Sequence, residues 1–209
     1  MGIILASTSA RRREILALLG ISFEVIAPAF DERVSAHLAI EEEVLDFALG
    51  KARSVARRHP QSIVIGSDTM ISVEGQKIGK PADISDATRI LRELAGKVHR
   101  IHTSVAIIDG SGGPGLEVVE QVSVRMRPYL DEDIEDYLAC GESFDKAGAY
   151  SIQGEGRGLI DSIEGDFLAA VGLPLKPIAG YLASREICLP VDVDRLYAEK
   201  RYLNWREFR

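Results

Sequence analysis

One long alternating segment at 98–109, followed by a glycine-rich run at 110–115 and a second apolar segment at 116–126, constrains the fold more than any other feature. Alternation with a period of two is typical of β-strands, and the second segment is expected to be the returning strand. The glycine run lacks the strand–glycine–helix context of a dinucleotide-binding fingerprint, so we interpret it as a hairpin turn. A long antiparallel pair is therefore expected in the sheet.

Shorter segments supply the remaining elements. Apolar runs predict strands at 3–6, 22–26, 62–66 and 159–163, with a hairpin formed by 70–73 and 77–78. Apolar residues at helical spacing predict helices after Ser9 and at 40–58, 85–94, 130–139 and 172–184. Strands and helices are mixed irregularly, which predicts an α/β fold with a mixed sheet rather than a regular doubly wound one.

Size, charge and cysteine content restrict the class of protein. The 209 residues suit one domain, or two tightly joined lobes. A net charge of −7 and a pI near 5.2 argue against non-specific binding to nucleic acid or to an anionic membrane, although a small anionic ligand is compatible with them. Cys140 and Cys188 form no CxxC motif, so neither a disulfide framework nor a zinc site is indicated.

Targeting signals are not apparent in the sequence. No signal peptide precedes the first predicted strand, and no apolar run reaches the roughly 18 residues of a membrane-spanning helix. We therefore expect a cytoplasmic protein that does not bind membranes.

The N-terminal strand leads into a run of hydroxyl and basic residues. Ser9 is placed to cap a helix whose first turn contains Arg11 and Arg12. Cations are mildly disfavoured there, because the N-terminal end of a helix is positive and prefers anions. Two arginines beside free N–H groups and the Ser7 hydroxyl suggest an anion site, for instance for nucleotide phosphates. A solvated basic helix start is the alternative interpretation.

Two acidic residues are candidates for chemistry. Asp68 follows the apolar run 62–66, and ligands tend to lie at strand ends in α/β sheets. A carboxylate there could hold Mg²⁺ or accept a proton from water, although a turn aspartate that bonds its own backbone is the alternative. Glu32 could supply a second oxygen ligand to magnesium, or could simply be a surface residue.

Other motifs are weaker. Lys80, between Gly79 and Pro81, is a candidate phosphate contact, but the glycine spacing and the proline exclude a P-loop. The histidines show no metal-ligand spacing, and His99 and His102 are expected to be structural. Covalent catalysis has no support, because no GxSxG motif occurs and neither cysteine has a recognisable catalytic setting.

Taken together, seven ordered blocks resemble the Maf family of nucleoside triphosphate pyrophosphatases. They are LASTSARR (5–12), DE (31–32), KA (51–52), GSDT (66–69), GKP (79–81), KAGAYSIQG (146–154) and GLPL (172–175). The resemblance implies an elongated mixed sheet with flanking helices and two lobes around a central cleft, similar to the inosine triphosphatase fold. It also implies one such domain at 1–184, followed by a tail at 185–209 of unknown role.

The resemblance further implies a reaction. Members of the family cut the bond between the α- and β-phosphates of a nucleoside triphosphate with a divalent metal, Mg²⁺ or Mn²⁺. The Asp68–Thr69 pair and the Ile152–Gln153–Gly154 block are similar to the branch that acts on dTTP and UTP. A homodimer is expected by resemblance alone.

Residue roles also follow from the resemblance. Asp68 would accept the proton of the attacking water, and Glu32 would help to hold metal or substrate. Substrate choice is expected from Arg11, Thr69 and Gln153, and phosphate contacts from Ser7, Arg12, Lys51 and Lys80. The chain departs from the family pattern at Ala10, usually a proline, and at 165–171, which is more apolar than usual.

Two other functions stay open on the sequence. One is a regulator, for instance of cell division, that binds a triphosphate without hydrolysing it. The other is a pyrophosphatase of the same fold for purine or modified nucleotides. The enzyme hypotheses require that Arg11 and Arg12 share one pocket with Asp68.

Overall fold

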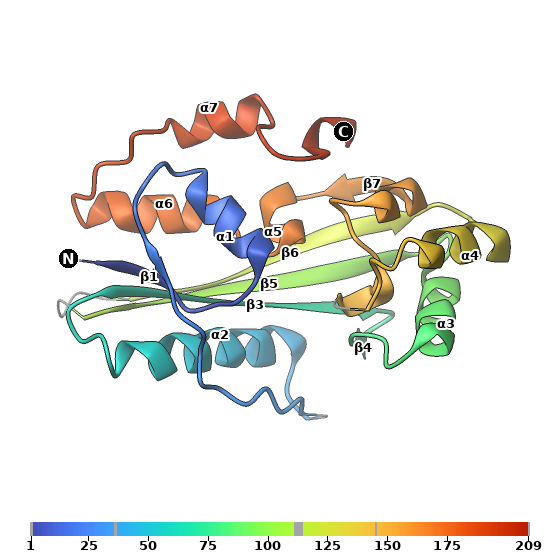
Figure 1. Cartoon of the computed structure of the whole chain (residues 1–209), viewed down its shortest axis with the longest axis horizontal. Coiled ribbons are helices and arrows are strands. Elements are labelled where there is room, and N and C mark those ends of the chain that lie inside the picture. Colours follow the sequence, from blue (N-terminus) through green and yellow to red (C-terminus); the bar gives the residue numbers. More distant parts are fainter. Residues whose placement is uncertain (1, 36, 111–114, 145, 209) are drawn as a thin grey trace.

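The computed structural model describes residues 2–35, 37–110, 115–144 and 146–208. A long sheet runs along the elongated molecule, with helices on both faces and at one end (Figure 1). Within the described residues the sheet has seven strands: β1 (Ile3–Leu5), β2 (Glu24–Val25), β3 (Ile63–Val73), β4 (Gln76–Ile78), β5 (Val98–Asp109), β6 (Leu116–Met126) and β7 (Ile160–Glu164). The predicted mixed α/β fold is confirmed.

The sheet combines parallel and antiparallel pairs. Its strand order is β2-β1-β3-β5-β6-β7, with β4 paired to β3. β1 is parallel to β2 and β3, whereas β3, β5, β6 and β7 pair antiparallel. The long hairpin of β5 and β6 has the predicted bounds. Its turn was predicted at 110–115, and residues 111–114 of that prediction lie outside the described residues.

β3 differs from the prediction at a functionally important point. The predicted hairpin is confirmed, because 71–73 pair antiparallel with β4. However, the sequence suggests that the preceding strand ends near residue 66, whereas β3 is one strand from Ile63 to Val73. Asp68 pairs with Ser104 of β5 within this strand, so it is not at the end of its own strand. The parallel pairing with β1 stops at Ile65. Asp68 therefore lies just beyond the carboxyl end of the neighbouring strand, where ligands bind in α/β sheets.

Helices flank the sheet on both sides. Those of the described residues are α1 (Ala10–Ala17), α2 (Ile40–Ala56), α3 (Ile84–Leu94), α4 (Asp131–Ala139), α5 (Phe167–Val171), α6 (Leu175–Ser184) and α7 (Val193–Ala198), with 3₁₀ turns η1 (Ala147–Ala149), η2 (Glu155–Leu159) and η3 (Trp205–Glu207). α2 covers one face, whereas α1, α5 and α6 cover the other (Figure 1). α5 and α7 were not predicted, and β2 is shorter than the predicted strand 22–26.

α2 packs unusually close to β3. Its apolar stripe, which includes Phe47, Ala48 and Ala52, is buried against the sheet. A Cβ atom added to Gly66 would lie 2.2 Å from the carbonyl oxygen of Ala48, so a larger residue there would push the helix away. The glycine therefore lets Lys51 of α2 reach the sheet beside Asp68.

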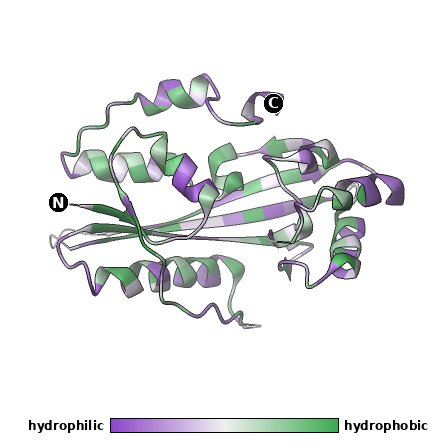
Figure 2. Ribbon diagram, viewed as in Figure 1, coloured by the Kyte–Doolittle hydropathy of each residue, from purple (hydrophilic) through white to green (hydrophobic). Residues whose placement is uncertain are grey.

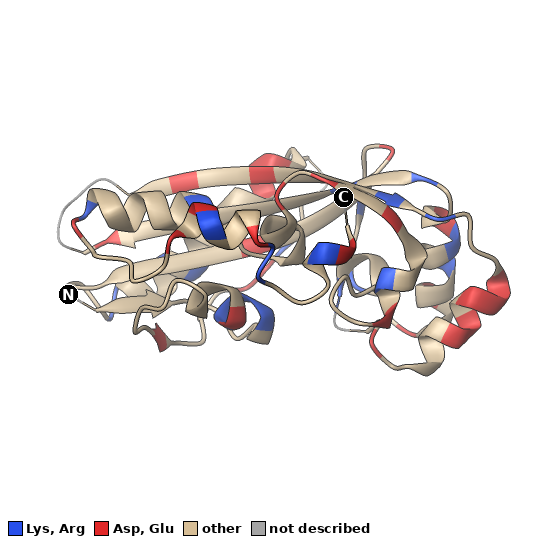
Figure 3. Cartoon of the chain, turned by 90° about the horizontal axis from the view of Figure 1, so that it is seen from above, with Lys and Arg blue, Asp and Glu red and all other residues tan. Residues whose placement is uncertain are grey.

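The other face holds most of the hydrophobic core. Every residue of α5 is buried, and Figure 2 shows this short helix as a hydrophobic ribbon. Asp166 caps α5, because its Oδ1 accepts hydrogen bonds from the backbone N–H groups of Leu168 and Ala169. Charge is concentrated elsewhere: α4, at one end of the molecule, carries acidic residues in its first turn (Figure 3).

Residues 186–208, here called the C-terminal segment, fold back over α6 and α5 (Figure 1). Leu196, Trp205 and Phe208 are buried in the main core. The Trp205 ring stacks on Phe167 of α5 with 5.3 Å between ring centroids. The segment is thus packed against the sheet domain along its length. Among the described residues, none of the helices combines the length and the apolar composition that a membrane-spanning helix needs.

Candidate active site

A single cavity of about 790 Å³ brings the predicted residues together. This volume is within the roughly 300–1,000 Å³ that is usual for small-molecule sites. All of the candidates line it: Ser7, Arg11, Arg12, Glu32, Lys51, Asp68, Thr69, Lys80 and Gln153. The condition stated for the enzyme hypotheses is therefore met, because both arginines and Asp68 share this pocket. Their individual roles stay predictions.

The loop from β1 to α1 forms the N-terminal wall. As predicted, Ser9 caps α1, its Oγ accepting from the backbone N–H of Arg12 at 3.4 Å. The hydroxyl oxygen of the buried Ser7 accepts from the backbone N–H of Ser9 at 3.2 Å. Arg11 lies in the first turn of the helix and lines the cavity. The positive end of the helix and the arginines make this wall suitable for an anion.

Arg12 is held by two hydrogen bonds to residues that also line the cavity. Its Nε donates to the carbonyl oxygen of Gly172 at 2.9 Å, and its Nη2 donates to Thr69 Oγ1 at 3.1 Å. Thr103 of β5 donates to the carbonyl oxygen of Ala169 at 2.8 Å, and its hydroxyl is also hydrogen-bonded to Thr69 Oγ1 at 3.1 Å. Burial lowers the pKa of Arg12 and the carboxylate of Asp68 opposes this, but a guanidinium keeps its proton in proteins. The contacts fix the guanidinium while leaving further N–H donors for a ligand.

Lys51 joins two carboxylates at the floor of the cavity. Its Nζ lies 2.5 Å from Asp68 Oδ1 and 2.6 Å from Glu32 Oε1. Lys51 and Asp68 are buried, whereas the Glu32 side chain is 47% exposed on the loop before α2. This charge network is the part of the site that the close approach of α2 to Gly66 creates.

The two carboxylates differ in their pKa. Burial is the largest influence on Asp68 and raises its pKa, although the cations of Lys51 and Arg12 act in the opposite direction. For Glu32, burial also acts upward but is outweighed by Lys51, Lys80 and Arg12, so its pKa is lowered. Asp68 is therefore a better proton acceptor than an ordinary aspartate, while Glu32 stays ionised. Such a pair suits general base catalysis beside a bound anion.

The remaining candidates come from other segments of the chain. Lys80 follows β4 and is exposed, and Gln153 lies between η1 and η2. The Gln153 side chain donates from Nε2 to the Tyr202 hydroxyl at 2.6 Å. Lys146, which no prediction assigned, also lines the cavity, with its Nζ donating to the carbonyl oxygen of Glu142 at 2.7 Å. The only sequence feature that could have identified Lys146 as a cavity residue is its position in the block 146–154.

Sequence reasoning missed Tyr202 altogether. It lies in the tail for which no role was predicted, and no spacing in the sequence connects it to Gln153.

His99 and His102, expected to be structural, do not line the cavity. The first contacts Tyr150 Oη through Nε2 at 2.7 Å, and the second contacts Ser72 Oγ at 2.9 Å.

Two carboxylates of the cavity, those of Asp68 and Glu32, are candidates to hold a divalent metal. The described residues include no group of three or more His, Cys, Asp or Glu side chains that could hold an ion by itself. Asp68 and Glu32 nevertheless reach the same lysine nitrogen, so their carboxylates are neighbours. Magnesium is commonly held by one or two carboxylates together with substrate phosphates. The donor set fits an ion that arrives with a nucleotide.

Comparisons with known proteins agree with the resemblance seen in the sequence. The family described as "Maf-like protein" matches residues 2–185. A dTTP/UTP pyrophosphatase of Moorella thermoacetica is 42% identical over 181 residues, which are 87% of this chain and 93% of that protein. One of Symbiobacterium thermophilum is 44% identical over 173 residues, covering 83% and 88%.

Among solved structures, the Staphylococcus aureus Ham1 protein matches 61% of this chain and 73% of its own, with a TM-score of 0.44 and 16% identity. The family match is far more extensive, since it covers every element from β1 to α6 and all seven blocks of the resemblance. The chain belongs to the Maf-like protein family.

Proposed function

We propose that this protein is a nucleoside triphosphate pyrophosphatase that hydrolyses the α–β phosphate bond of dTTP and UTP to the monophosphate and pyrophosphate. Relatives that carry the name dTTP/UTP pyrophosphatase at about 40% identity over most of the chain support this activity. The observation that carries the proposal is the position of Asp68. It is a buried carboxylate with a raised pKa in the same cavity as Arg11 and Arg12.

In this proposal Asp68 accepts a proton from water as the water oxygen bonds to phosphorus and pyrophosphate leaves. The raised pKa strengthens the carboxylate as a proton acceptor, and Lys51 at 2.5 Å favours its ionised form. Positive charge around the phosphates lowers the barrier, because phosphoryl transfer depends mainly on positioning and charge stabilisation. Ser7, Arg12, Lys51 and Lys80 would provide these contacts.

A divalent cation, Mg²⁺ or Mn²⁺, would bind at the floor of the cavity, beside the carboxylates of Asp68 and Glu32. Asp68 and Glu32 would hold it together with the substrate phosphates. When bound, it would neutralise charge on the phosphate oxygens. The nucleoside would contact Arg11, Thr69 and Gln153 on the walls of the cavity. That the protein acts as a cytoplasmic homodimer, and binds neither nucleic acid nor membranes, stays a prediction.

The test is to incubate the purified chain with each common ribo- and deoxyribonucleoside triphosphate, in Mg²⁺ and in Mn²⁺. Products are separated by ion-exchange chromatography. We expect pyrophosphate and a monophosphate, formed fastest from dTTP and UTP. Release of orthophosphate and a diphosphate would contradict the proposal, as would tight nucleotide binding without any hydrolysis.

A further inference from the structure

The C-terminal segment, residues 186–208, lies beyond the family match at 2–185 but contacts Gln153, which lines the candidate site. Tyr202 and Asn204 of this segment both contact Gln153. Besides the side-chain bond to Tyr202, Asn204 Nδ2 donates to the backbone oxygen of Gln153 at 2.8 Å. A part of the chain outside the shared family region thus holds both the backbone and the side chain of a cavity residue.

The direction of the hydrogen bonds at Tyr202 determines how the Gln153 amide is turned. The Tyr202 hydroxyl donates to Glu14 Oε2 at 3.1 Å, since a carboxylate can only accept. Burial, with Glu14 next in effect, raises the pKa of Tyr202, so the phenol keeps the proton that it donates. Its oxygen is then the acceptor toward Gln153, and the amide must present Nε2 to it. The amide oxygen Oε1 is left for a ligand, because no group of the described residues bonds it.

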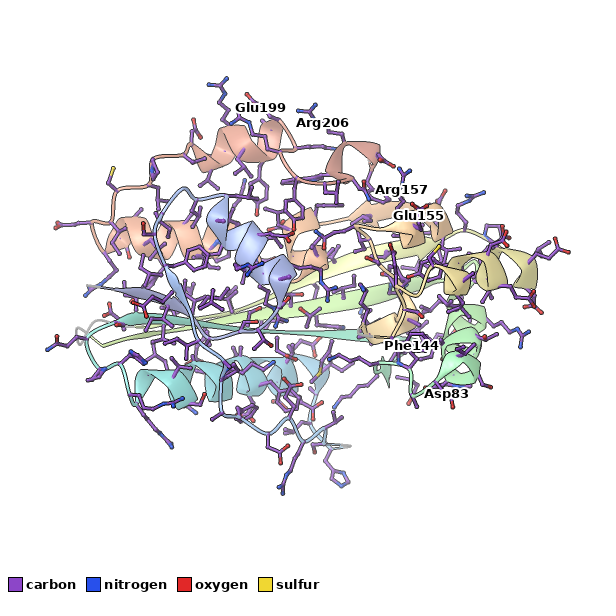
Figure 4. The ribbon with its side chains drawn as sticks, in the orientation of Figure 1. Asp83, Phe144, Glu155, Arg157, Glu199 and Arg206 are labelled. Atoms are coloured by element: carbon purple, nitrogen blue, oxygen red, sulfur yellow. The ribbon has the colours of Figure 1, made fainter. Side chains whose placement is uncertain are left out.

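The residues that follow Tyr202 are anchored to the rest of the protein. Trp205 packs between Tyr197 and Phe167, with ring centroids 5.0 and 5.3 Å away. An ion pair joins Glu207 to Arg157, which Figure 4 shows on η2 next to the segment. Glu199 and Arg206, also labelled there, lie on its outer side. Packing and charge therefore fix the Tyr202 backbone relative to the cavity.

We propose that Tyr202 is a positioning residue for base selection, which turns the Gln153 amide so that its oxygen accepts the N3–H of uracil or thymine. Cytosine carries a lone pair at N3 instead of a hydrogen, so the same oxygen would repel it. The C-terminal segment thereby adds discrimination between pyrimidines to a site whose phosphate contacts lie elsewhere. The inference rests on the proposed function, in that it takes the cavity ligand to be a nucleotide whose base reaches Gln153.

Binding of unhydrolysable nucleotides tests this independently of catalysis. The probes are deoxyuridine and deoxycytidine triphosphates with an α,β-imido bridge, titrated by calorimetry against the full-length chain in Mg²⁺. Wild type should bind the uracil probe more tightly. Tyr202→Phe removes one hydroxyl and keeps the ring, and should reduce this preference about tenfold, the scale of one buried hydrogen bond. In a Gln153→Ala background the same substitution should have no further effect.

Tyr197→Phe is the matched control. It removes a hydroxyl of the same segment that donates to Asp166 Oδ2 at 2.9 Å and has no bond to Gln153. It should leave the preference unchanged, and thermal melting checks that each variant is folded. The inference is overturned if Tyr202→Phe keeps the wild-type preference, if Tyr197→Phe loses it equally, or if Tyr202→Phe still acts without Gln153. Preferential uracil binding without pyrophosphate release would instead overturn the proposed function and leave the inference standing.

Discussion

Replacing Asp68 by asparagine should separate catalysis from stability. The substitution keeps the shape of the side chain and an oxygen that can accept from Lys51, but removes the charge and the basicity. Lys51 keeps its ion pair with Glu32 at 2.6 Å, so no isolated buried cation is created. Loss of a general base typically lowers turnover roughly 100- to 10,000-fold, which is about 3–5 kcal/mol in the activation free energy.

Asp68→Asn is expected to lower turnover but not the free energy of unfolding. Burial raises the pKa of Asp68, so the folded chain binds that proton more tightly than the unfolded chain. The contribution of Asp68 to the free energy of unfolding is therefore largest at low pH and is lost as pH rises through the raised pKa. Asparagine does not titrate. At neutral pH the variant should be at least as stable as the wild type.

The assay measures pyrophosphate release from dTTP together with urea unfolding at neutral pH. Asp109→Asn is the control, because this carboxylate is also buried but lies outside the cavity, 2.8 Å from Arg185 Nε and bonded to the Tyr181 hydroxyl. It should cost about 1–3 kcal/mol of stability and leave turnover nearly unchanged. Near wild-type turnover of Asp68→Asn would contradict the role of Asp68 as general base, and unfolding of this variant at lower urea than the wild type would contradict the raised pKa.

Three further predictions concern the floor, the core and the tail. Lys51→Met removes the cation that lowers the pKa of Asp68, so the acid limb of the pH–rate profile should move to higher pH; an unmoved limb contradicts the assigned coupling. Burial lowers the pKa of His99 to about 4, so folding stability should fall by about 3 kcal/mol as pH drops from about 6.5 to 4. Urea titrations should show a smaller fall for His99→Gln. Trp205→Ala deletes the ring stacked on Phe167 and should lower the free energy of unfolding by about 3–5 kcal/mol; a loss below about 1 kcal/mol would mean that the segment is not docked.

Most elements could be predicted from local sequence patterns. The alternation at 98–109 predicts the bounds of β5 correctly, and Ser9 is predictable as a helix cap because capping depends on residues close in sequence. The prediction of strand ends failed where pairing with a neighbouring strand determines the end. The apolar run predicts a strand that ends at Gly66, but β5 pairs with β3 beyond that residue and keeps the polar residues 67–69 in the strand. The short helix α5 was missed because its five buried residues are too few to show a helical period.

The family, the mixed α/β class and a set of cavity residues follow from the amino-acid sequence, because ordered blocks and short-range periodicity are properties of the chain. How those residues act on one another depends on the tertiary structure. Lys51 meets Asp68 because Gly66 lets α2 approach the sheet, and burial there changes the pKa of the carboxylate. Likewise, Tyr202 reaches Gln153 across 49 positions only because the C-terminal segment folds back. Burial and contact between distant residues arise from packing, which no local pattern encodes.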